Sequence, residues 1–355
     1  CETDAELAAN AGWLHWLMGQ GAAAARYAAL VEAAGGALLP RLRSLRACLT
    51  LTQLASETAV AEVASLLAEL DEAEHFFRNM VLLLLAEAQN THGDVAGSVE
   101  TLRQAVAAGR ASHDPFMTVG ASVNLAQALN MQARRGEAEA LCRNLVAEFA
   151  SDASPSPMAG LALVTLGELV YQANALAEAE QLIQRGTALI EPLALLGADI
   201  SAQLALARLR QAQGAAAEAR HILAAVRQRL TQAHFDAYEP LLAAVEAELL
   251  LRQGVVEPVE KWAATAVSTL KQVSLYQREL DLLGLARLRL ATGQPEMALG
   301  FLAELEAVVQ QTGRQLVQIT VLLLRAQAFW RQDEGKMALA TAVRLAAPEN
   351  YRRLF

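Results

Sequence analysis

The stretch from Ala205 to Gly214, Ala-Leu-Ala-Arg-Leu-Arg-Gln-Ala-Gln-Gly, decides the fold because the chain repeats it. A second copy at 283–293, Leu-Gly-Leu-Ala-Arg-Leu-Arg-Leu-Ala-Thr-Gly, ends in a glycine 79 residues after the first. Glycine or asparagine recurs at similar steps along most of the chain. We take these residues as turn marks: Gly93, Gly136, Asn174, Gly214, Gly254, Gly293 and Gly335. Successive marks lie 38 to 43 residues apart, a period typical of stacked helical repeats.

Residue types at fixed distances from the marks explain the repeat physically. The position seven residues before each mark holds Ala86, Leu129, Gly167, Ala207, Ala247, Ala286 and Ala328. Six of these seven are Ala or Gly, so we expect the backbone there to approach another helix closely. The fifth residue after a mark is usually small, and the ninth is usually apolar. A helix, a left-handed turn at Gly or Asn, and an antiparallel helix satisfy this pattern.

We therefore expect an all-α fold without β-sheet, in which about nine antiparallel helix pairs stack as one right-handed superhelix with a period of about 40 residues. The unbroken period predicts a single domain over residues 1–355.

The turn and capping residues also predict where the pairs begin and end. The first helix should run from Asp4 to about Met18, turn at 19–21, and be followed by a partner ending at 35–36. The second pair should start at Pro40, turn near Ser56 and end before residue 71. Gly93-Asp94 should divide the third pair, and Asp114-Pro115 should start the fourth with a cap and a proline at the first helical position. Later pairs are expected at 158–197, 198–235, 236–276, 277–313 and 314–347, after a long connection at 151–157.

Composition excludes several partners. The net charge is −9, and the 29 basic residues include three lysines and form no stripe, so we expect no nucleic-acid binding. The longest apolar run, 80–86, is too short to cross a bilayer. Cys1, Cys48 and Cys142 lack paired or metal-ligand spacing, which predicts reduced thiols and a cytoplasmic location. A first residue that is cysteine could mark a lipidated N-terminus, but we favour a boundary within a longer chain.

Catalytic motifs are missing from the sequence. It contains no G-x-x-x-x-G-K-[ST] loop and no G-x-S-x-G elbow, and its six histidines show no zinc-ligand spacing. We therefore expect no enzyme, no metal site and no cofactor in this chain.

One column of the repeat carries polar residues. The position six residues before each mark holds Glu87, Asn130, Glu168, Arg208, Glu248, Arg287 and Phe329. Equivalent positions of a solenoid line up on one surface, so this column could meet a ligand. The alternating signs from Glu168 to Arg287 instead favour a ladder of ion pairs, since packed helix axes lie about 8–10 Å apart. The two interpretations are compatible, because a ladder can also position groups for a ligand.

Two further stretches resemble a known family. Residues 167–176, Gly-Glu-Leu-Val-Tyr-Gln-Ala-Asn-Ala-Leu, are similar to the Gly-Glu-Leu-x-Tyr-x-x-Asn-x-Leu signature of large ATP-dependent LuxR-type transcriptional activators of the MalT kind. The end, Pro-Glu-Asn-Tyr-Arg-Arg-Leu-Phe at 348–355, resembles the Pro-Glu-Gly-Tyr-x-Arg-x-Phe segment that closes their tetratricopeptide (TPR)-like repeat region. Asn350 replaces the usual Gly, and Ala173 stands where Trp is common. The resemblance covers essentially the whole chain, most specifically residues 158–355.

The resemblance implies a sensor domain in the cytoplasm. Such activators combine an N-terminal ATPase module, a superhelical region that receives an inducer, and a C-terminal helix-turn-helix. This chain matches the middle part, so the expected partners are a small-molecule inducer, the ATPase module, and a further copy or an inhibitory protein. The alternative is a stand-alone scaffold that binds a protein or peptide in its groove.

We expect the inducer to contact hydrogen-bonding and aromatic residues near the middle of the solenoid. The candidate ligand-binding residues are Asn130, Glu168, Tyr171, Arg208, His234, Tyr238 and Arg287. Tyr171 lies three residues after Glu168, so the two should share a helix face, and Arg208 is the counterpart of Glu168 one repeat later.

Overall fold

The computed structural model describes residues 2–17, 20–34, 57–70, 75–150, 155–233 and 238–355. These residues form seventeen α-helices and no β-strand, which confirms the all-α prediction. The first half contains α1 (Glu2–Leu17), α2 (Gly21–Ala33), α4 (Glu57–Glu69), α5 (His75–Thr91), α6 (Val95–Ala111), α7 (Pro115–Met131), α8 (Arg135–Phe149), α9 (Ala159–Gln172) and α10 (Leu176–Ile190). The second half contains α11 (Leu196–Ala212), α12 (Ala216–Ala233), α13 (Glu239–Arg252), α14 (Glu257–Thr269), α15 (Leu275–Ala291), α16 (Pro295–Thr312), α17 (Gln315–Ala328) and α18 (Asp333–Ala346). The predicted helix from 40 to 56 lies outside the described residues.

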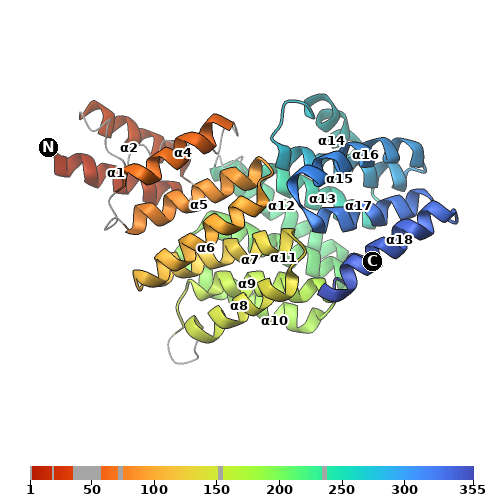
Figure 1. Cartoon of the computed structure of the whole chain (residues 1–355), viewed down its shortest axis with the longest axis horizontal. Helices are drawn as coiled ribbons and strands as arrows, with labels where there is room; N and C mark the ends of the chain where they lie inside the picture. The colour runs from red at the N-terminus through yellow and green to blue at the C-terminus, as the bar shows by residue number, and fades with distance from the viewer. Residues whose placement is uncertain (1, 18–19, 35–56, 71–74, 151–154, 234–237) are drawn as a thin grey trace.

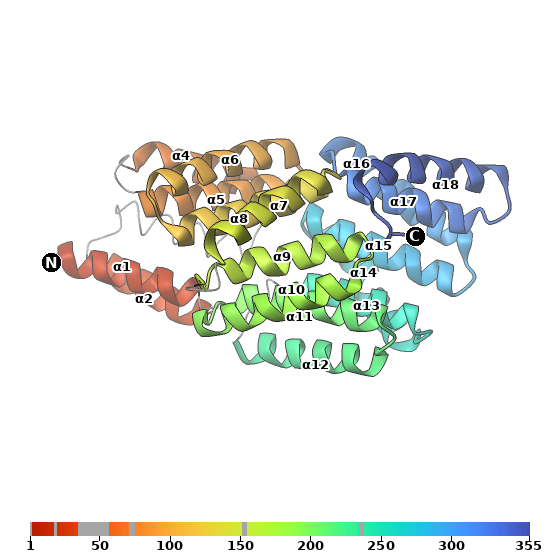
Figure 2. The same ribbon diagram turned by 90° about the horizontal axis from the view of Figure 1, so that it is seen from below.

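The helices stack as antiparallel pairs in a superhelix (Figures 1 and 2). Each odd-numbered helix from α5 to α17 contacts the next odd-numbered helix as well as its own partner. The odd-numbered helices therefore form one continuous layer, and the even-numbered helices from α6 to α18 cover it. This arrangement places equivalent positions of successive odd-numbered helices side by side.

Local capping sets several helix starts where the sequence predicts them. The Asp94 carboxylate accepts a hydrogen bond from the Gly97 amide at 2.8 Å, and the Asp114 carboxylate accepts one from the Phe116 amide at 2.8 Å. Proline occupies the first turn of α7 and α16, where its missing N–H removes no intrahelical bond. The third pair is thus divided, and the fourth pair begins, where the sequence predicts.

Two of the seven turn marks are wrong. Gly93, Asn174, Gly214, Gly254 and Gly293 have positive φ as expected, but Gly136 and Gly335 lie inside α8 and α18. The left-handed turn residues there are Ala133 (φ 55°) and Arg331 (φ 68°). Left-handed backbone costs a non-glycine residue roughly 1–2 kcal/mol, but contacts with the surrounding structure can offset this cost. A search for Gly or Asn therefore placed these two turns three and four residues too late in the chain.

The corrected marks change the polar column. Six residues before Ala133 and Arg331 stand Gln127 and Arg325, in place of Asn130 and Phe329. All seven positions of the column are therefore polar, and Asn130 is not the counterpart of Glu168.

Small residues lie where the odd-numbered helices meet their neighbours. Ala207, Ala247 and Ala286 are buried, as predicted. A Cβ atom added to Gly167 would lie 2.6 Å from Ile183 Cγ1 and 3.2 Å from the Ala179 carbonyl oxygen. The close approach of α9 and α10 therefore requires glycine at this position.

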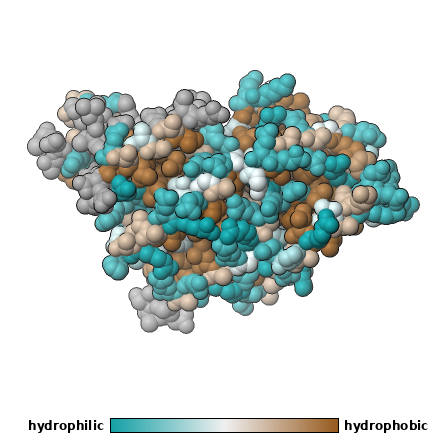
Figure 3. Space-filling view, viewed as in Figure 1, coloured by the Kyte–Doolittle hydropathy of each residue, from teal (hydrophilic) through white to brown (hydrophobic). Residues whose placement is uncertain are grey.

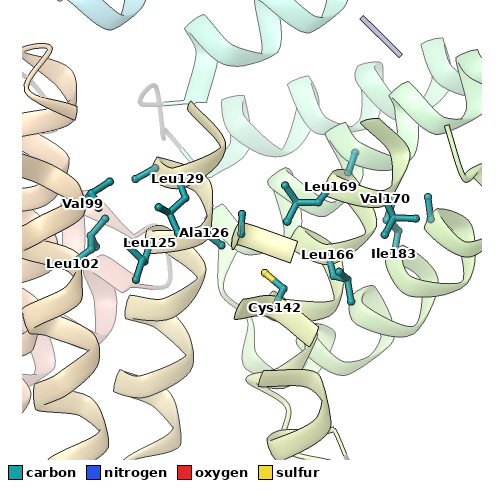
Figure 4. Close-up of a cluster of buried hydrophobic side chains, with 14 of the residues drawn as sticks. Val99, Leu102, Leu125, Ala126, Leu129, Cys142, Leu166, Leu169, Val170 and Ile183 are labelled. Carbon is teal, nitrogen blue, oxygen red and sulfur yellow. The ribbon is translucent and has the colours of Figure 1, made fainter. Parts of the chain in front are cut away.

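One cluster of the apolar core extends over several successive pairs. Figure 4 shows side chains of α6, α7, α8, α9 and α10 in one cluster that includes Leu102, Leu129, Cys142 and Ile183. Cys142 is a free, fully buried thiol, and burial raises its pKa to about 12. It therefore packs as a small apolar side chain and is not a reactive thiol.

The two ends of the stack expose apolar side chains. Large exposed apolar residues occur on the first pair and around the last helix: Leu7, Leu14, Leu30, Trp330, Met337, Leu339, Val343, Leu345 and Phe355. Terminal repeats lack one neighbour, so a face that would be covered elsewhere stays open. On the face seen in Figure 3, apolar patches alternate with polar residues. None of the helices described is both long and apolar enough to span a bilayer.

The superhelix closes on itself. Helix α5 contacts α15, and α7 contacts α17, although these helices lie far apart in sequence (Figure 2). The Arg314 guanidinium, just before α17, donates to the Asn90 carbonyl oxygen at 2.5 Å and to the Asn90 side-chain oxygen at 2.9 Å. We call this contact region between α5–α7 and α15–α17 the seam.

Candidate functional site

A ladder of charged side chains crosses the layer of odd-numbered helices. Arg208 Nη1 on α11 lies 3.8 Å from Glu168 Oε1 on α9, and Arg287 Nη1 on α15 lies 3.9 Å from Glu248 Oε2 on α13. The charges of Arg287 and Arg208 both lower the pKa of Glu248, against the effect of burial. These four residues come from four successive pairs, and two of the three ion pairs of the predicted ladder are present. Among the described residues no ion pair joins Arg208 to Glu248, whose nearest cation is Arg252 on the same helix, at 3.2 Å. Each of the four ladder side chains keeps 20–30% of its surface exposed.

Closure of the superhelix brings Glu87 of α5 toward this ladder. Burial raises the pKa of Glu87, while the charge of Arg314 and a hydrogen bond from the Thr91 hydroxyl act in the opposite direction. The Glu87 side chain is nevertheless solvent-exposed.

Two tyrosines belong to the same region. Tyr238, directly before α13, is hydrogen-bonded to Ser201, and burial and the charge of Glu87 raise its pKa. Burial first, and the same Glu87 charge second, raise the pKa of Tyr276, in the first turn of α15, to about 12. Both phenols therefore lie within electrostatic reach of a carboxylate that comes from the other side of the seam.

Arg314 lies at the seam, where several contacts hold its side chain in place. Its Nη1 atom lies 3.3 Å from Glu279 Oε1, and both side chains are almost fully buried. The guanidinium also lies over the ring of Tyr276, 5.5 Å from the ring centroid. Arg314 is thus held by a carboxylate, by Asn90 and by an aromatic face.

We define the interior polar cluster as Glu87, Glu168, Arg208, Tyr238, Glu248, Tyr276, Arg287 and Arg314. These residues come from α5, α9, α11, α13 and α15 and from the residues preceding α13 and α17. Their carboxylates, guanidinium groups and phenols can hold a polar ligand by hydrogen bonds and charge, and they include no nucleophile aligned with a base. We therefore interpret the cluster as a binding site.

Four of the seven predicted ligand-binding residues lie in this cluster: Glu168, Arg208, Tyr238 and Arg287. His234 lies outside the described residues. Asn130 and Tyr171 are engaged by the C-terminal segment. The Tyr351 hydroxyl donates to the Asn130 side-chain oxygen at 2.9 Å, and the Arg353 guanidinium lies 5.2 Å from the centroid of the Tyr171 ring.

Sequence reasoning did not select four members of the cluster as site residues: Glu87, Glu248, Tyr276 and Arg314. Glu87 does stand in the polar column, six residues before Gly93. Its electrostatic effect on Tyr238 and Tyr276 depends on closure of the superhelix, and a repeat period describes only neighbouring repeats. The polar column was therefore the one signal in the sequence that included Glu87. It could not show which of its residues come close together in the folded chain.

The C-terminal segment, residues 347–355, forms a clasp on the turns of α7–α10. Arg135 Nε donates to the Glu349 carbonyl oxygen at 2.5 Å, and the Gly136 amide donates to the Glu349 carboxylate at 2.6 Å. The amides of Arg352 and Arg353 both donate to the Gln172 carbonyl oxygen at 2.9 Å. Asn350 has φ 54°, which agrees with its replacing a glycine.

A separate groove of about 870 Å³ lies between α2 and α10–α12 and contains none of the ladder residues. Two of its charged side chains, Arg229 and Asp199, form an ion pair with each other. The interior polar cluster is the better candidate, because six helices or their ends hold its charged groups in place.

Two solved structures are similar to this chain, and the first of them supports the fold. A Rap protein complexed with competence and sporulation factor has a TM-score of 0.52 at 13% identity, with 89% of this chain and 100% of that chain covered. A tetratricopeptide repeat protein from Parabacteroides merdae has a TM-score of 0.41 at 14% identity, with 76% and 91% covered. A search of curated protein sequences found no match.

The stacked helix pairs define the class, a helical repeat protein, and the first of these likenesses shows the same fold. The family described as the MalT-like TPR region matches residues 41–355. The chain belongs to this family.

Proposed function

We propose that this chain is the inducer-sensing region of a MalT-like, ATP-dependent LuxR-type transcriptional regulator. In this proposal a small molecule binds the interior polar cluster, and the region passes the signal to an ATPase module and to a DNA-binding module of the same protein. The chain itself has no catalytic role and binds no nucleic acid.

The observation that carries the proposal is the accessible polar cluster inside a closed superhelix. Its residues come from repeats far apart in sequence, so a ligand in it touches several repeats at once. Membership of the MalT-like family over residues 41–355 supports the assignment to a sensor. The charge of Glu87 acts on Tyr238 and Tyr276 across the seam, so a ligand that bridges the two sides of the seam favours the closed arrangement.

The mechanism has two steps. The inducer binds and favours one of two arrangements of the region relative to the ATPase module. The ATP-bound regulator then self-associates and activates transcription. The inducer can shift this equilibrium only by its difference in affinity for the two arrangements.

Arg208→Ala tests the site, with the exposed Arg103→Ala as matched control. A library of small polar metabolites is screened against the whole chain by thermal shift, and the affinity of each hit is measured for the wild type and both variants. We expect Arg208→Ala to weaken binding at least about tenfold, or 1.4 kcal/mol, with a small change in the melting temperature of the free protein. Each lost ladder pair should cost only about 0.2–1 kcal/mol. Equal affinity in all three proteins would rule out this site.

A stand-alone scaffold that binds a peptide is the second candidate. It is favoured by the likeness to a Rap protein complexed with competence and sporulation factor. A peptide library screened in the same assay distinguishes the two. Tight peptide binding that survives Arg208→Ala, together with no small-molecule hit, would favour the scaffold.

A further inference from the structure

Two sets of contacts close the superhelix, and they are of different kinds. At the clasp, Tyr351 is almost fully buried and belongs to an apolar cluster with Ala133 and Ile319, so side chains from both sides pack together. Hydrogen bonds from Arg135 and to the Gln172 carbonyl oxygen add to this packing. The clasp therefore combines apolar burial with several hydrogen bonds.

The α5 side of the seam is built differently. None of the apolar clusters formed by the described residues combines α5 or α6 with α15, α16 or α17. In the described part of the chain, the hydrogen bonds between these two groups of helices both run from Arg314 to Asn90, at 2.5 and 2.9 Å. Beside them, the Gly93 backbone lies close to the side chains of Leu275 and Thr312. This part of the closure therefore depends on one polar side chain and one close backbone approach.

Arg314 keeps its charge partner when it releases Asn90. Its Nη1 atom lies 3.3 Å from Glu279 Oε1 on α15, and its guanidinium lies over the ring of Tyr276 on the same helix. Its bonds to Asn90 end on a neutral carbonyl oxygen and a neutral amide oxygen, and water can replace both. Opening therefore breaks no ion pair, and it avoids the large cost of a buried charge that has lost its partner.

Three buried polar atoms at the seam have no hydrogen-bond partner within the described protein: Arg314 Nε, Glu279 Oε2 and Thr312 Oγ1. Each of these residues is at most 6% exposed. A buried polar atom without a partner destabilises the state that buries it. Separation of α5 and α6 from this surface lets water reach it, so the closed arrangement carries a cost that the open one lacks.

We propose that Arg314 is a latch, and that the superhelix opens between α5–α6 and α15–α17 while the clasp stays closed. Helices α1–α6 then move away from the latch, and the clasp keeps the end of the chain on the turns of α7–α10. The change belongs to this chain alone and needs no ligand, so its test is separate from that of the proposed function.

Distances between labelled positions test the proposal on the whole chain. Spin labels attached through unnatural amino acids replace the exposed residues Glu100 on α6 and Lys336 on α18, and pulsed electron paramagnetic resonance measures the distance between them. A second pair, the exposed Ala177 on α10 and Lys336, reports on the clasp. We expect the wild type to show one main Glu100–Lys336 distance with a minor longer one, and a single Ala177–Lys336 distance.

The latch variant combines Arg314→Met with Glu279→Leu, because apolar replacement of both members of a buried ion pair often leaves stability unchanged or raised. It should increase the share of the longer distance at least about threefold. Asn90→Ala, which keeps the buried ion pair, should act in the same direction but less strongly. The matched control is Arg278→Met, which removes an ion pair between α15 and α16 and should change nothing. A melting curve checks that each variant folds.

Three outcomes overturn the proposal. The first is an equal share of the longer distance in the wild type and the latch variant. The second is an Ala177–Lys336 distance that lengthens together with the other pair, because the clasp would then open as well. The third is a control variant that opens as much as the latch variant, because the effect would then come from general loosening around α15. If the double substitution does not fold, the comparison of Asn90→Ala with the wild type decides between the same outcomes.

Discussion

Glu279 and Asp281 stand two residues apart on α15 and are both buried, but their surroundings differ. Glu279 pairs with Arg314, whereas Asp281 forms no ion pair within the described part of the chain. One Asp281 carboxylate oxygen also lacks a hydrogen-bond partner there. Burial alone raises the pKa of Asp281 to about 6, from an ordinary value of 3.8. An unpaired buried charge of this kind lowers stability when it is ionised.

Asp281→Asn should therefore stabilise the protein at neutral pH. A folded-state pKa above the unfolded value means that the wild type loses stability as the pH rises from about 4 through 6. The gain from Asn should be present above pH 6 and absent near pH 4. A shift of about 2 units corresponds to at most about 3 kcal/mol, so we expect roughly 1–3 kcal/mol. Urea titrations at pH 5 and pH 8 measure the difference, and a gain of equal size at both would contradict this account.

At the scale of the helices, spacing and capping predicted most of the pattern. The turns at Gly93, Gly214 and Gly254, and the capped start at Asp114, lie where the sequence places them. The register failed at Ala133, because a left-handed backbone there is supported by packing and not by residue type. That error also led to Asn130 being selected as a member of the polar column.

The small residues seven positions before the turn marks give a test of the helix crossings. Ala207 on α11 is fully buried, so Ala207→Leu should overpack the crossing and cost about 1–3 kcal/mol. Ala177→Leu, at an exposed position of α10, should change stability by less than about 0.5 kcal/mol. Chemical denaturation of the two variants provides the comparison. Similar midpoints would show that the crossing tolerates a large side chain.

The clasp includes one buried hydroxyl, that of Tyr351, which can be removed without changing the packing. Tyr351 is 2% exposed and packs among Ile319, Leu323 and Ala342, with its hydroxyl on Asn130. Tyr351→Phe should cost about 0.5–1.5 kcal/mol. A double-mutant cycle with Asn130→Ala measures the coupling between the two side chains. Additive effects would mean that this hydrogen bond does not help to hold the clasp.

At the scale of the whole molecule, closure was beyond the reach of sequence reasoning. Arg314 and Asn90 lie 224 residues apart, and no periodic signal links them. The C-terminal motif was recognised through its resemblance to a family, but its seat on Arg135 and Gln172 was not. Two ion pairs of the ladder could be predicted from the repeat, whereas the effect of Glu87 on the two tyrosines across the seam could not.

Gly93 lies at the seam and gives a test of closure. A Cβ atom there would lie 2.5 Å from Thr312 Cγ2 and 2.8 Å from Leu275 Cδ2, with φ at 91°. Gly214 has a similar φ of 86°, but a Cβ atom there would meet nothing within 4 Å. Both alanine variants should therefore incur backbone strain of about 1–2 kcal/mol, and Gly93→Ala should also loosen the seam.

Small-angle X-ray scattering distinguishes the two variants. We expect a larger radius of gyration for Gly93→Ala than for Gly214→Ala or the wild type. The same radius for all three proteins would show that closure does not depend on contact at Gly93.

The clasp also changes how the last repeat should lose its structure. In an open stack the terminal repeat has one neighbour, so its amide protons exchange with solvent before those of the middle. Here α17 contacts α7, and residues 347–355 rest on the turns of α7–α10, with hydrogen bonds that join residues 213 and 214 positions apart. Hydrogen exchange at this end should therefore be as slow as in the centre, and fraying should begin elsewhere.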